Sequence, residues 1–363
     1  MKYLKTYILF ESKSNLKFTK QPKKKGAKTE IYNVSKEGNV IGQIKWSSRM
    51  RGYAFLPTND ISDEIKDFVN SMVTNDLNRI ESGQAQYNLF CNDAGGVIDD
   101  LIVYRNSDTD FFIVPNASNT SAVVADLQAN APSGITVTNL HNEYGVIALQ
   151  GPLAAKVLAH FGLQIEIDYM AFTYVSIAGC DVIVCRTGYT GEYGFEVLPK
   201  WDQALTVWDA LVEQVEANEG LVCGLGARDT LRTEMGYPLH GHELSLAISP
   251  VMASANWAVG WNKAKFQGSE VLKDQKENGV SRRLVALKSL DRGIPRPDMQ
   301  VLHEGAEVGI VTSGTFSPSL KTGIALALVD SVFKVGQQLE LDVRGRTSSV
   351  EIVKLPFMPS HVR

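Results

Sequence analysis

The sequence predicts an α+β protein of several domains that closes with an all-β domain. Its 363 residues are enough for two or three separate cores. From residue 86 onward, short β-type runs alternate with segments of helical periodicity, which is typical of mixed domains. After about residue 280 the helical pattern ends. Five short β-type runs then follow one another with turns between them, which indicates a sandwich or a barrel.

The composition is that of an ordinary globular enzyme. Apolar residues make up 44% of the chain, charged residues 21%, and the formal net charge is −4. We therefore expect neither nucleic acid nor a membrane as a partner, and no apolar run reaches the roughly 20 residues that a spanning helix needs. Cys91, Cys180, Cys185 and Cys223 form no CxxC pair, which favours reduced thiols. We expect a cytoplasmic location and no secretory signal.

The first 50 residues differ in charge from the rest of the chain. They hold twelve Lys or Arg against three acidic residues, an excess that suits either a solvated surface or contact with an acidic partner. Residues 11–29 are polar and rich in lysine, and we expect a flexible arm there. Glu30–Val34, Val40–Trp46 and Tyr53–Leu56 are β-type runs between turn residues, so they predict a small β-meander.

A first helix is predicted over Asp60–Ile80, where apolar residues recur at helical spacing and Asp60 or Ser62 is a suitable N-cap. The strands predicted next are Leu101–Tyr104, Phe111–Val114, Gly145–Leu149 and Val182–Cys185. The helices among them are Thr120–Gln128 and Trp201–Ala217. The closing β-type runs are Leu284–Leu287, Val308–Thr312, Gly323–Leu328, Leu339–Val343 and Ser348–Val353.

The segment from Gly95 to Asp100, with the sequence GGVIDD, carries two adjacent carboxylates on a short strand. The two glycines allow a tight turn and close approach of another backbone. Neighbouring strand residues point to opposite faces. One of Asp99 and Asp100 can therefore face a cavity while the other faces solvent or caps the turn. A polar hairpin turn without a binding role explains the same residues.

A glycine-rich loop, Arg186 to Glu196, leads from one strand into another. A flat ligand can lie close to such a backbone, with Tyr189 as a stacking surface and Glu196 as a bidentate acceptor for an edge with two donors, such as that of a pterin. A glycine-rich turn with a structural tyrosine is the alternative.

The segment Gly224–Asp229 opens a predicted helix, but the third glycine of a dinucleotide loop is missing. Arg228 at this helix start suits a ligand carboxylate or a structural salt bridge. His240-Gly241-His242 has no further ligands at a suitable spacing, so we expect no metal.

The order of these segments resembles the aminomethyltransferase (T-protein) family of the glycine cleavage system over about residues 66–363. The segments that carry the resemblance are Gly83–Tyr87, Gly95–Tyr104, Leu149–Pro152, Arg186–Glu192, Gly224–Arg232, Tyr237–Gly241, Ile248–Val251 and Thr312–Pro318. The family's opening elements, Phe-Ala-Gly-Trp and Asp-Val-Ser-His-Met, do not occur in this chain, so the first 50 residues are unmatched.

The resemblance implies a three-domain cloverleaf around a central folate tunnel, with a barrel-like last domain and a first domain that is incomplete or substituted. We divide the chain into an unmatched part (1–50), two α/β domains (51–148 and 149–278) and the all-β domain (279–363). By the same resemblance Asp100 is the catalytic aspartate, Glu196 accepts the pterin edge and Tyr189 stacks on the ring. The other pocket positions that it implies are Tyr87, Asn116 and Arg228.

The reaction that the resemblance implies takes an aminomethyl group from the lipoyl arm of H-protein to tetrahydrofolate and releases ammonia. Lipoylated H-protein is then the protein partner and tetrahydrofolate the co-substrate, and no metal is needed. Two alternatives remain open. One is another tetrahydrofolate-dependent demethylase of the superfamily. The other is a folate-binding chain whose catalysis is impaired by the altered N-terminus.

Overall fold

The computed structural model describes residues 16–20, 32–36, 39–47, 52–57, 60–164, 166–343 and 345–363. Its side chains are described from residue 64 onward. The chain divides into two compact units, one of residues 1–69 and 108–110 and the other of residues 70–107 and 111–363. All six residues predicted to form the site belong to the second unit.

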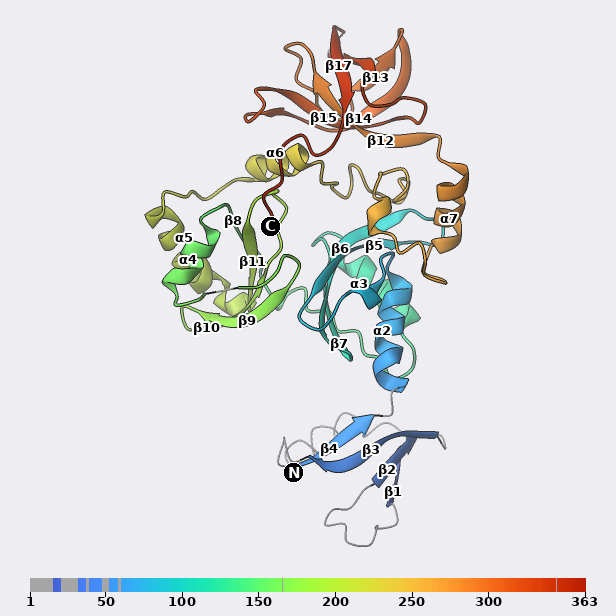
Figure 1. Ribbon diagram of the computed structural model, residues 1–363, viewed down its shortest axis with the longest axis vertical. Helices are drawn as coiled ribbons and strands as arrows, with labels where there is room; N and C mark the ends of the chain where they lie inside the picture. The colour runs from blue at the N-terminus through green and yellow to red at the C-terminus, as the bar shows by residue number, and fades with distance from the viewer. Residues whose placement is uncertain are drawn as a thin grey trace. The chain divides into compact units, whose positions relative to one another are not determined.

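The first unit contains an antiparallel sheet, with its four strands in chain order (Figure 1). The strands are β1 (Leu16–Lys20), β2 (Tyr32–Lys36), β3 (Asn39–Ser47) and β4 (Gly52–Pro57). They confirm the predicted β-meander. The expectation of a flexible arm is wrong at residues 16–20, because the sequence LKFTK alternates apolar and polar residues and pairs in register with β2. The remainder of the predicted arm lies outside the described residues.

Helix α2 (Asp60–Met72) confirms the first predicted helix but is shorter than predicted. The backbone after it binds partners elsewhere in the chain. The Thr74 N–H donates to the carbonyl of Leu89 at 3.0 Å, and Lys263 Nζ donates to the carbonyl of Val73 at 2.6 Å. These long-range bonds draw the chain out of the helix before the apolar stripe ends.

A three-stranded antiparallel sheet carries the GGVIDD segment. Its strands are β5 (Ala85–Cys91), β6 (Val97–Ser107) and β7 (Asp110–Val114), and helix α3 (Thr120–Asn130) follows. The predicted strands and helix of this region are confirmed. We did not predict β5, because six of its seven residues are buried and a strand that is buried on both faces lacks the alternation that marks a half-exposed one.

A second sheet in this unit has the order β8-β11-β10-β9. Its strands are β8 (Ile147–Gln150), β9 (Phe172–Ile177), β10 (Cys180–Cys185) and β11 (Gly194–Pro199). Helices α4 (Ala154–His160) and α5 (Ala204–Ala217) cover one face of it (Figure 1), and their apolar residues share a core cluster with the strands. The helix predicted to start at Trp201 opens with a 3-10 turn before α5.

Helix α6 (Leu225–Met235) confirms that the segment Gly224–Asp229 opens a helix, with Gly224 at its N-cap, and α7 (Ser269–Asn278) leads to the last domain. Among the described residues, none of the helices combines the length and the apolarity that crossing a bilayer requires.

The chain closes with a six-stranded barrel in the order β12-β15-β14-β13-β16-β17 (Figure 1). The strands are β12 (Arg282–Ser289), β13 (Gln300–His303), β14 (Ala306–Ser317), β15 (Thr322–Asp330), β16 (Gln338–Asp342) and β17 (Thr347–Val353). Its core is aliphatic, and closure leaves no free sheet edge. The α+β class and the all-β closing domain are therefore confirmed, while the domain boundaries at 50, 148 and 278 stay a prediction.

Candidate functional site

Asp99 anchors the start of α3. Its side chain is fully buried. The backbone N–H of Asn116 donates to Oδ2 at 2.9 Å, and the side-chain amides of Asn116 and Asn119 donate to Oδ1 at 2.9 and 2.7 Å. The expectation that this carboxylate faces solvent or caps the glycine turn is wrong. Three N–H donors instead replace the water that this carboxylate loses on burial, so Asp99 has a structural role.

Asp100 has fewer donors and a different electrostatic environment. The Tyr87 hydroxyl donates to Oδ2 at 3.1 Å, and the Asn116 amide donates to Oδ1 at 2.9 Å. The pKa of Asp100 is raised to about 6, mainly by burial and next by the charge of Asp99, while the hydrogen bonds from Tyr87 and Asn116 and the nearby His240 lower it. A carboxyl group with this pKa can exchange a proton near neutral pH.

Tyr87 links Asp100 to an exposed aromatic side chain. Its ring stacks on Trp257 with 5.0 Å between ring centroids, and Trp257 is 63% exposed. Burial, together with the charge of Asp100, raises the pKa of Tyr87 well above its ordinary value. The phenol therefore remains protonated and acts as a donor to the carboxylate.

Gln150 holds the glycine-rich loop in place. Its Nε2 donates to the carbonyls of Thr187 (3.2 Å) and Phe195 (2.9 Å), and its Oε1 accepts from the Thr190 hydroxyl at 2.9 Å. A Cβ on Gly188 would lie 2.1 Å from this Oε1, so the loop approaches Gln150 too closely for a side chain. Gln150 belongs to the Leu149–Pro152 motif, but nothing in the sequence indicated that its side chain would hold the glycine-rich loop.

Tyr189 lies between an aromatic ring and a cation. Its hydroxyl donates to the Pro238 carbonyl, its ring stacks on Tyr237 with centroids 5.7 Å apart, and the Arg228 guanidinium lies 4.6 Å from the ring centroid. Burial raises the pKa of Tyr189 above its ordinary value, and the nearby charge of Asp100 adds to this increase. The structure thus brings Tyr189 and Arg228 into the neighbourhood of Asp100.

Glu196, on β11, is the last acceptor in a chain of hydrogen bonds between hydroxyl groups, which we call the relay. The Thr187 hydroxyl donates to Glu196 Oε2 at 2.6 Å, so the Tyr104 hydroxyl, 3.4 Å from Thr187 Oγ1, must donate to Thr187. Burial raises the pKa of Tyr169, with smaller contributions from Tyr237 and Glu196. Tyr169 therefore lies within charge range of Glu196 and of Tyr237, whose ring stacks on Tyr189.

The chain returns to the glycine-rich loop after the barrel. The backbone N–H of His361 donates to the Gly191 carbonyl at 2.7 Å, and Arg186 Nη2 donates to the Val362 carbonyl at 2.6 Å. His361 Nδ1 is 2.6 Å from Glu192 Oε1. The C-terminal tail, residues 360–363, is thus bonded to the loop that carries Tyr189.

The predicted residues fall into three neighbouring groups. Tyr87, Asp100 and Asn116 form a hydrogen-bonded group, Tyr189 pairs with Arg228, and Glu196 ends the relay. Together they offer a proton-exchanging carboxyl, an aromatic surface, a cation and an acceptor. In the part of the chain that the structure describes, no three His, Cys, Asp or Glu side chains are arranged to hold a metal ion. The expectation of no metal stays a prediction.

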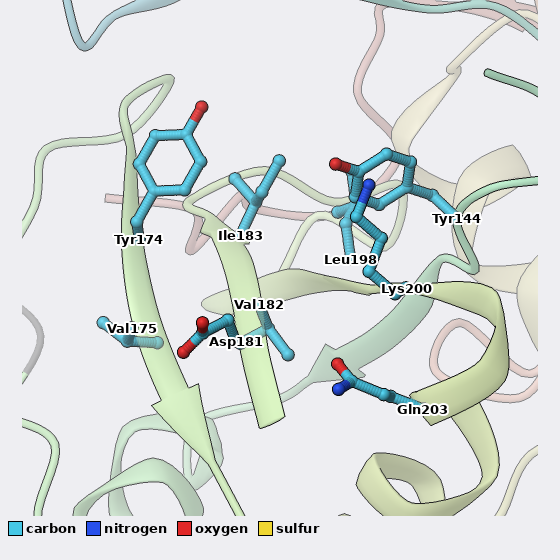
Figure 2. A pocket seen from close by; sticks show the side chains of 9 residues that line it. All are labelled: Tyr144, Tyr174, Val175, Asp181, Val182, Ile183, Leu198, Lys200 and Gln203. Carbon is cyan, nitrogen blue, oxygen red and sulfur yellow. The ribbon is translucent and has the colours of Figure 1, made fainter. Parts of the chain in front are cut away.

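A cavity of about 530 Å³ lies elsewhere, on the β9-β10-β11 side of the second sheet (Figure 2). It is lined by Tyr144, Tyr174, Val175, Asp181, Val182, Ile183, Leu198, Lys200 and Gln203. The Lys200 ammonium group lies 4.0 Å from the Tyr144 ring centroid. This polar group of the cavity lining therefore already has a partner within the chain. None of the predicted site residues lines this cavity. We place the candidate site at the three groups described above, because they contain a carboxyl group with a perturbed pKa.

Two family models match most of the chain. The GCVT N-terminal domain matches residues 63–263, and the glycine cleavage T-protein C-terminal barrel domain matches residues 282–358. The aminomethyltransferases of Parafrankia sp. (strain EAN1pec) and Mycobacterium avium (strain 104) are each 54% identical over 298 residues. This alignment covers 82% of this chain and 82% and 81% of theirs.

A solved structure agrees with the sequence matches. The glycine cleavage system aminomethyltransferase T from Bartonella henselae has a TM-score of 0.75 and 31% identity, and the match covers 82% of each chain. The predicted resemblance and fold type are confirmed, and residues 1–62 precede the first family match. The chain therefore belongs to the aminomethyltransferase (T-protein) family of the glycine cleavage system.

Proposed function

We propose that this transferase moves the aminomethyl carbon from the lipoyl arm of H-protein to tetrahydrofolate and releases ammonia. The relatives at 52–54% identity are aminomethyltransferases, which favours this donor over the small methylated amines of a demethylase. The observation that carries the proposal is the surrounding of Asp100, a carboxyl with a pKa of about 6 that is held by Tyr87 and Asn116.

Asp100 fits the role of a general base or acid. Tyr87 and Asn116 each donate to a different oxygen of this carboxylate, so its position is fixed from two sides. With a pKa of about 6 it can accept a proton from a ring nitrogen and return it near neutral pH. Asp99, which accepts three N–H bonds, holds Asn116 in place for it.

The other residues fit the parts of a reduced folate. Glu196 can accept the two-donor edge of a pterin, with the Thr187 hydroxyl fixing its Oε2. Arg228 is exposed at the start of α6 and suits the carboxylates of the glutamate tail. Because Arg228 now lies over the Tyr189 ring, a pterin can stack on that face only after Arg228 has moved. Bound folate supplies the nitrogen that receives the one-carbon unit.

Lipoylated H-protein is the proposed protein partner, and the cytoplasm the proposed location. All four cysteines are unpaired thiols, with Cys91, Cys180 and Cys185 buried. This pattern supports a reducing compartment.

The test uses the full chain with aminomethyl-loaded H-protein and tetrahydrofolate. We expect methylene-tetrahydrofolate and ammonia to appear in equal amounts. A small methylated amine in place of loaded H-protein should give no product, and turnover with it alone would identify a demethylase. Saturable tetrahydrofolate binding by calorimetry without turnover would show a folate-binding chain that is catalytically impaired. The absence of both binding and turnover would reject the proposal.

A further inference from the structure

The segment that follows α6, residues 237–246, connects two of the site groups, and we call it the 237–246 strap. At its start, the carbonyl of Pro238 accepts the Tyr189 hydroxyl. Near its end, the Ser245 carbonyl accepts the Val97 N–H at 2.8 Å. Val97 begins β6, two residues before Asp99. The strap therefore contacts the aromatic group at one end and the strand with both carboxylates at the other.

The strap holds Val97 by both of its backbone polar groups. The Val97 carbonyl lies 3.1 Å from His240 Nε2. Because a carbonyl oxygen can only accept, this imidazole nitrogen carries the proton. A Cβ on Gly96 would lie 2.0 Å from the Leu246 carbonyl oxygen, so the strap rests directly on the glycine turn. These contacts fix the start of β6 and therefore the positions of Asp99 and Asp100 on that strand.

A buried ion pair anchors the strap. Arg232 and Glu243 are 2% and 0% exposed, and Arg232 Nη1 lies 2.9 Å from Glu243 Oε2. The same oxygen accepts the Leu239 N–H at 3.0 Å. Arg232 Nη2 also donates to Ser313 Oγ on β14 at 2.7 Å. Arg232 Nη2 also pairs with Asp229 Oδ1 at 2.6 Å. Removing Arg232 would leave the Glu243 charge buried without its cation, so the pair itself is a poor site for mutation.

We propose that His240 is a positioning residue of the site, which acts through the Val97 carbonyl to fix Asp100 while the same strap fixes Tyr189. This inference rests on the proposed function, because the geometry that is fixed is that of the folate and proton-transfer groups. His240 is half-buried, and its ring lies within charge range of both carboxylates and lowers their pKa values. The titratable groups that act on Asp100 are Asp99, His240, Tyr87 and Tyr189.

Two variants separate position from charge. His240→Leu removes the donor to Val97, and His240→Gln keeps a side-chain N–H donor without a charge. For His240→Leu we expect kcat to fall by about 10-fold to 100-fold, because a displaced catalytic group loses that much. His240→Gln should retain most of kcat, but its acid limb should move to higher pH because His240 no longer lowers the pKa of Asp100. His303→Leu, which changes another half-buried histidine in the barrel, is the control.

A second measurement does not depend on turnover. In protein with ¹³C-labelled aspartate, the Asp100 carboxyl resonance is identified by its loss in Asp100→Asn, and its titration is followed by NMR. His240→Leu should shift its midpoint further than His240→Gln, because only the leucine variant also loses the donor to Val97. His303→Leu should leave the midpoint unchanged. A wild-type chain without turnover would reject the proposed function, yet the NMR result would still test the strap. An Asp100 midpoint in His240→Leu equal to that in His240→Gln, or wild-type kcat in His240→Leu, would overturn the inference.

Discussion

Asp99 and Asp100 are adjacent carboxylates whose pKa values are both raised by burial. Asp99 is fully buried, whereas Asp100 is only half-buried. Asp100→Asn keeps the shape of the side chain, so the chain should fold while kcat falls by roughly 100-fold or more. The acid limb of kcat, expected near pH 6 in the wild type, should vanish. If a folded Asp99→Asn lost turnover and Asp100→Asn did not, the catalytic assignment would be reversed.

The same carboxyl makes stability depend on pH. Its pKa is about 6 in the folded chain against an ordinary 3.8. Between these values the folded state keeps a proton that the unfolded state has released, so stability falls as pH rises through this window. Asp100→Asn should therefore be more stable than the wild type by roughly 1–3 kcal/mol at about pH 8, and equal to it at about pH 4. Thermal unfolding at both pH values checks this, and an equal gain at both would refute it.

Glu196 is expected to bind the pterin edge through a charge-assisted pair. Glu196→Ala should weaken tetrahydrofolate binding by roughly 1–3 kcal/mol, measured by calorimetry. Glu192→Ala is the matched control, because Glu192 lies in the same loop but is paired with His361. Equal affinity of the Glu196 variant and the wild type would remove Glu196 from this role.

At the scale of elements, the glycine-rich loop depends on one close approach. Gly188→Ala would place a methyl group against Gln150 Oε1, so we expect a loss of roughly 1–3 kcal/mol in unfolding free energy. Gln150→Ala removes the obstacle along with its own hydrogen bonds. The double variant should therefore lose less than the sum of the two single variants. Gly226→Ala is the control, because a Cβ at this position meets open space. If the losses of the two single variants simply add in the double variant, Gly188 and Gln150 are not crowded against each other.

The elements that the sequence predicted well are those with local signals. Five of the six barrel strands were predicted from short β-type runs, of which β17 alternates buried and exposed residues. The short strand β13 was not predicted. β5 was missed because it is buried on both faces. The end of α2 was misplaced because its backbone binds Leu89 and Lys263, which lie far along the chain.

The site was predictable in its residues but not in its connections. The motifs contain Asp100, Tyr189 and Glu196, yet the relay from Tyr104 to Thr187 joins residues 83 positions apart. No spacing rule predicts such a contact, because only the packed sheets bring the partners together. The burial of Asp99 and the part played by Gln150 depend on tertiary structure in the same way.

At the scale of the whole molecule, the C-terminal tail supports the loop that carries Tyr189. Removing residues 360–363 deletes the bonds to Gly191 and Arg186. We expect a lower Tm and weaker tetrahydrofolate binding, because the buried Arg186 loses an acceptor. His361→Ala, which removes only the partly exposed pair with Glu192, should change stability by less than about 1 kcal/mol. Full affinity and an unchanged Tm in the truncated chain would show that the tail is dispensable.

The contacts of the tail also affect when the glycine-rich loop can fold during synthesis. Arg186 and its acceptor Val362 are 176 positions apart, so the loop emerges from the ribosome long before its last partners have been made. Domains fold as they emerge, and the two sheets can form while translation continues, but this loop must wait for the barrel and the residues after it. A nascent chain that has not yet reached residue 362 therefore lacks the partners of this loop. A ligand that depends on this loop can stabilise the chain only after residues 360–363 have been made.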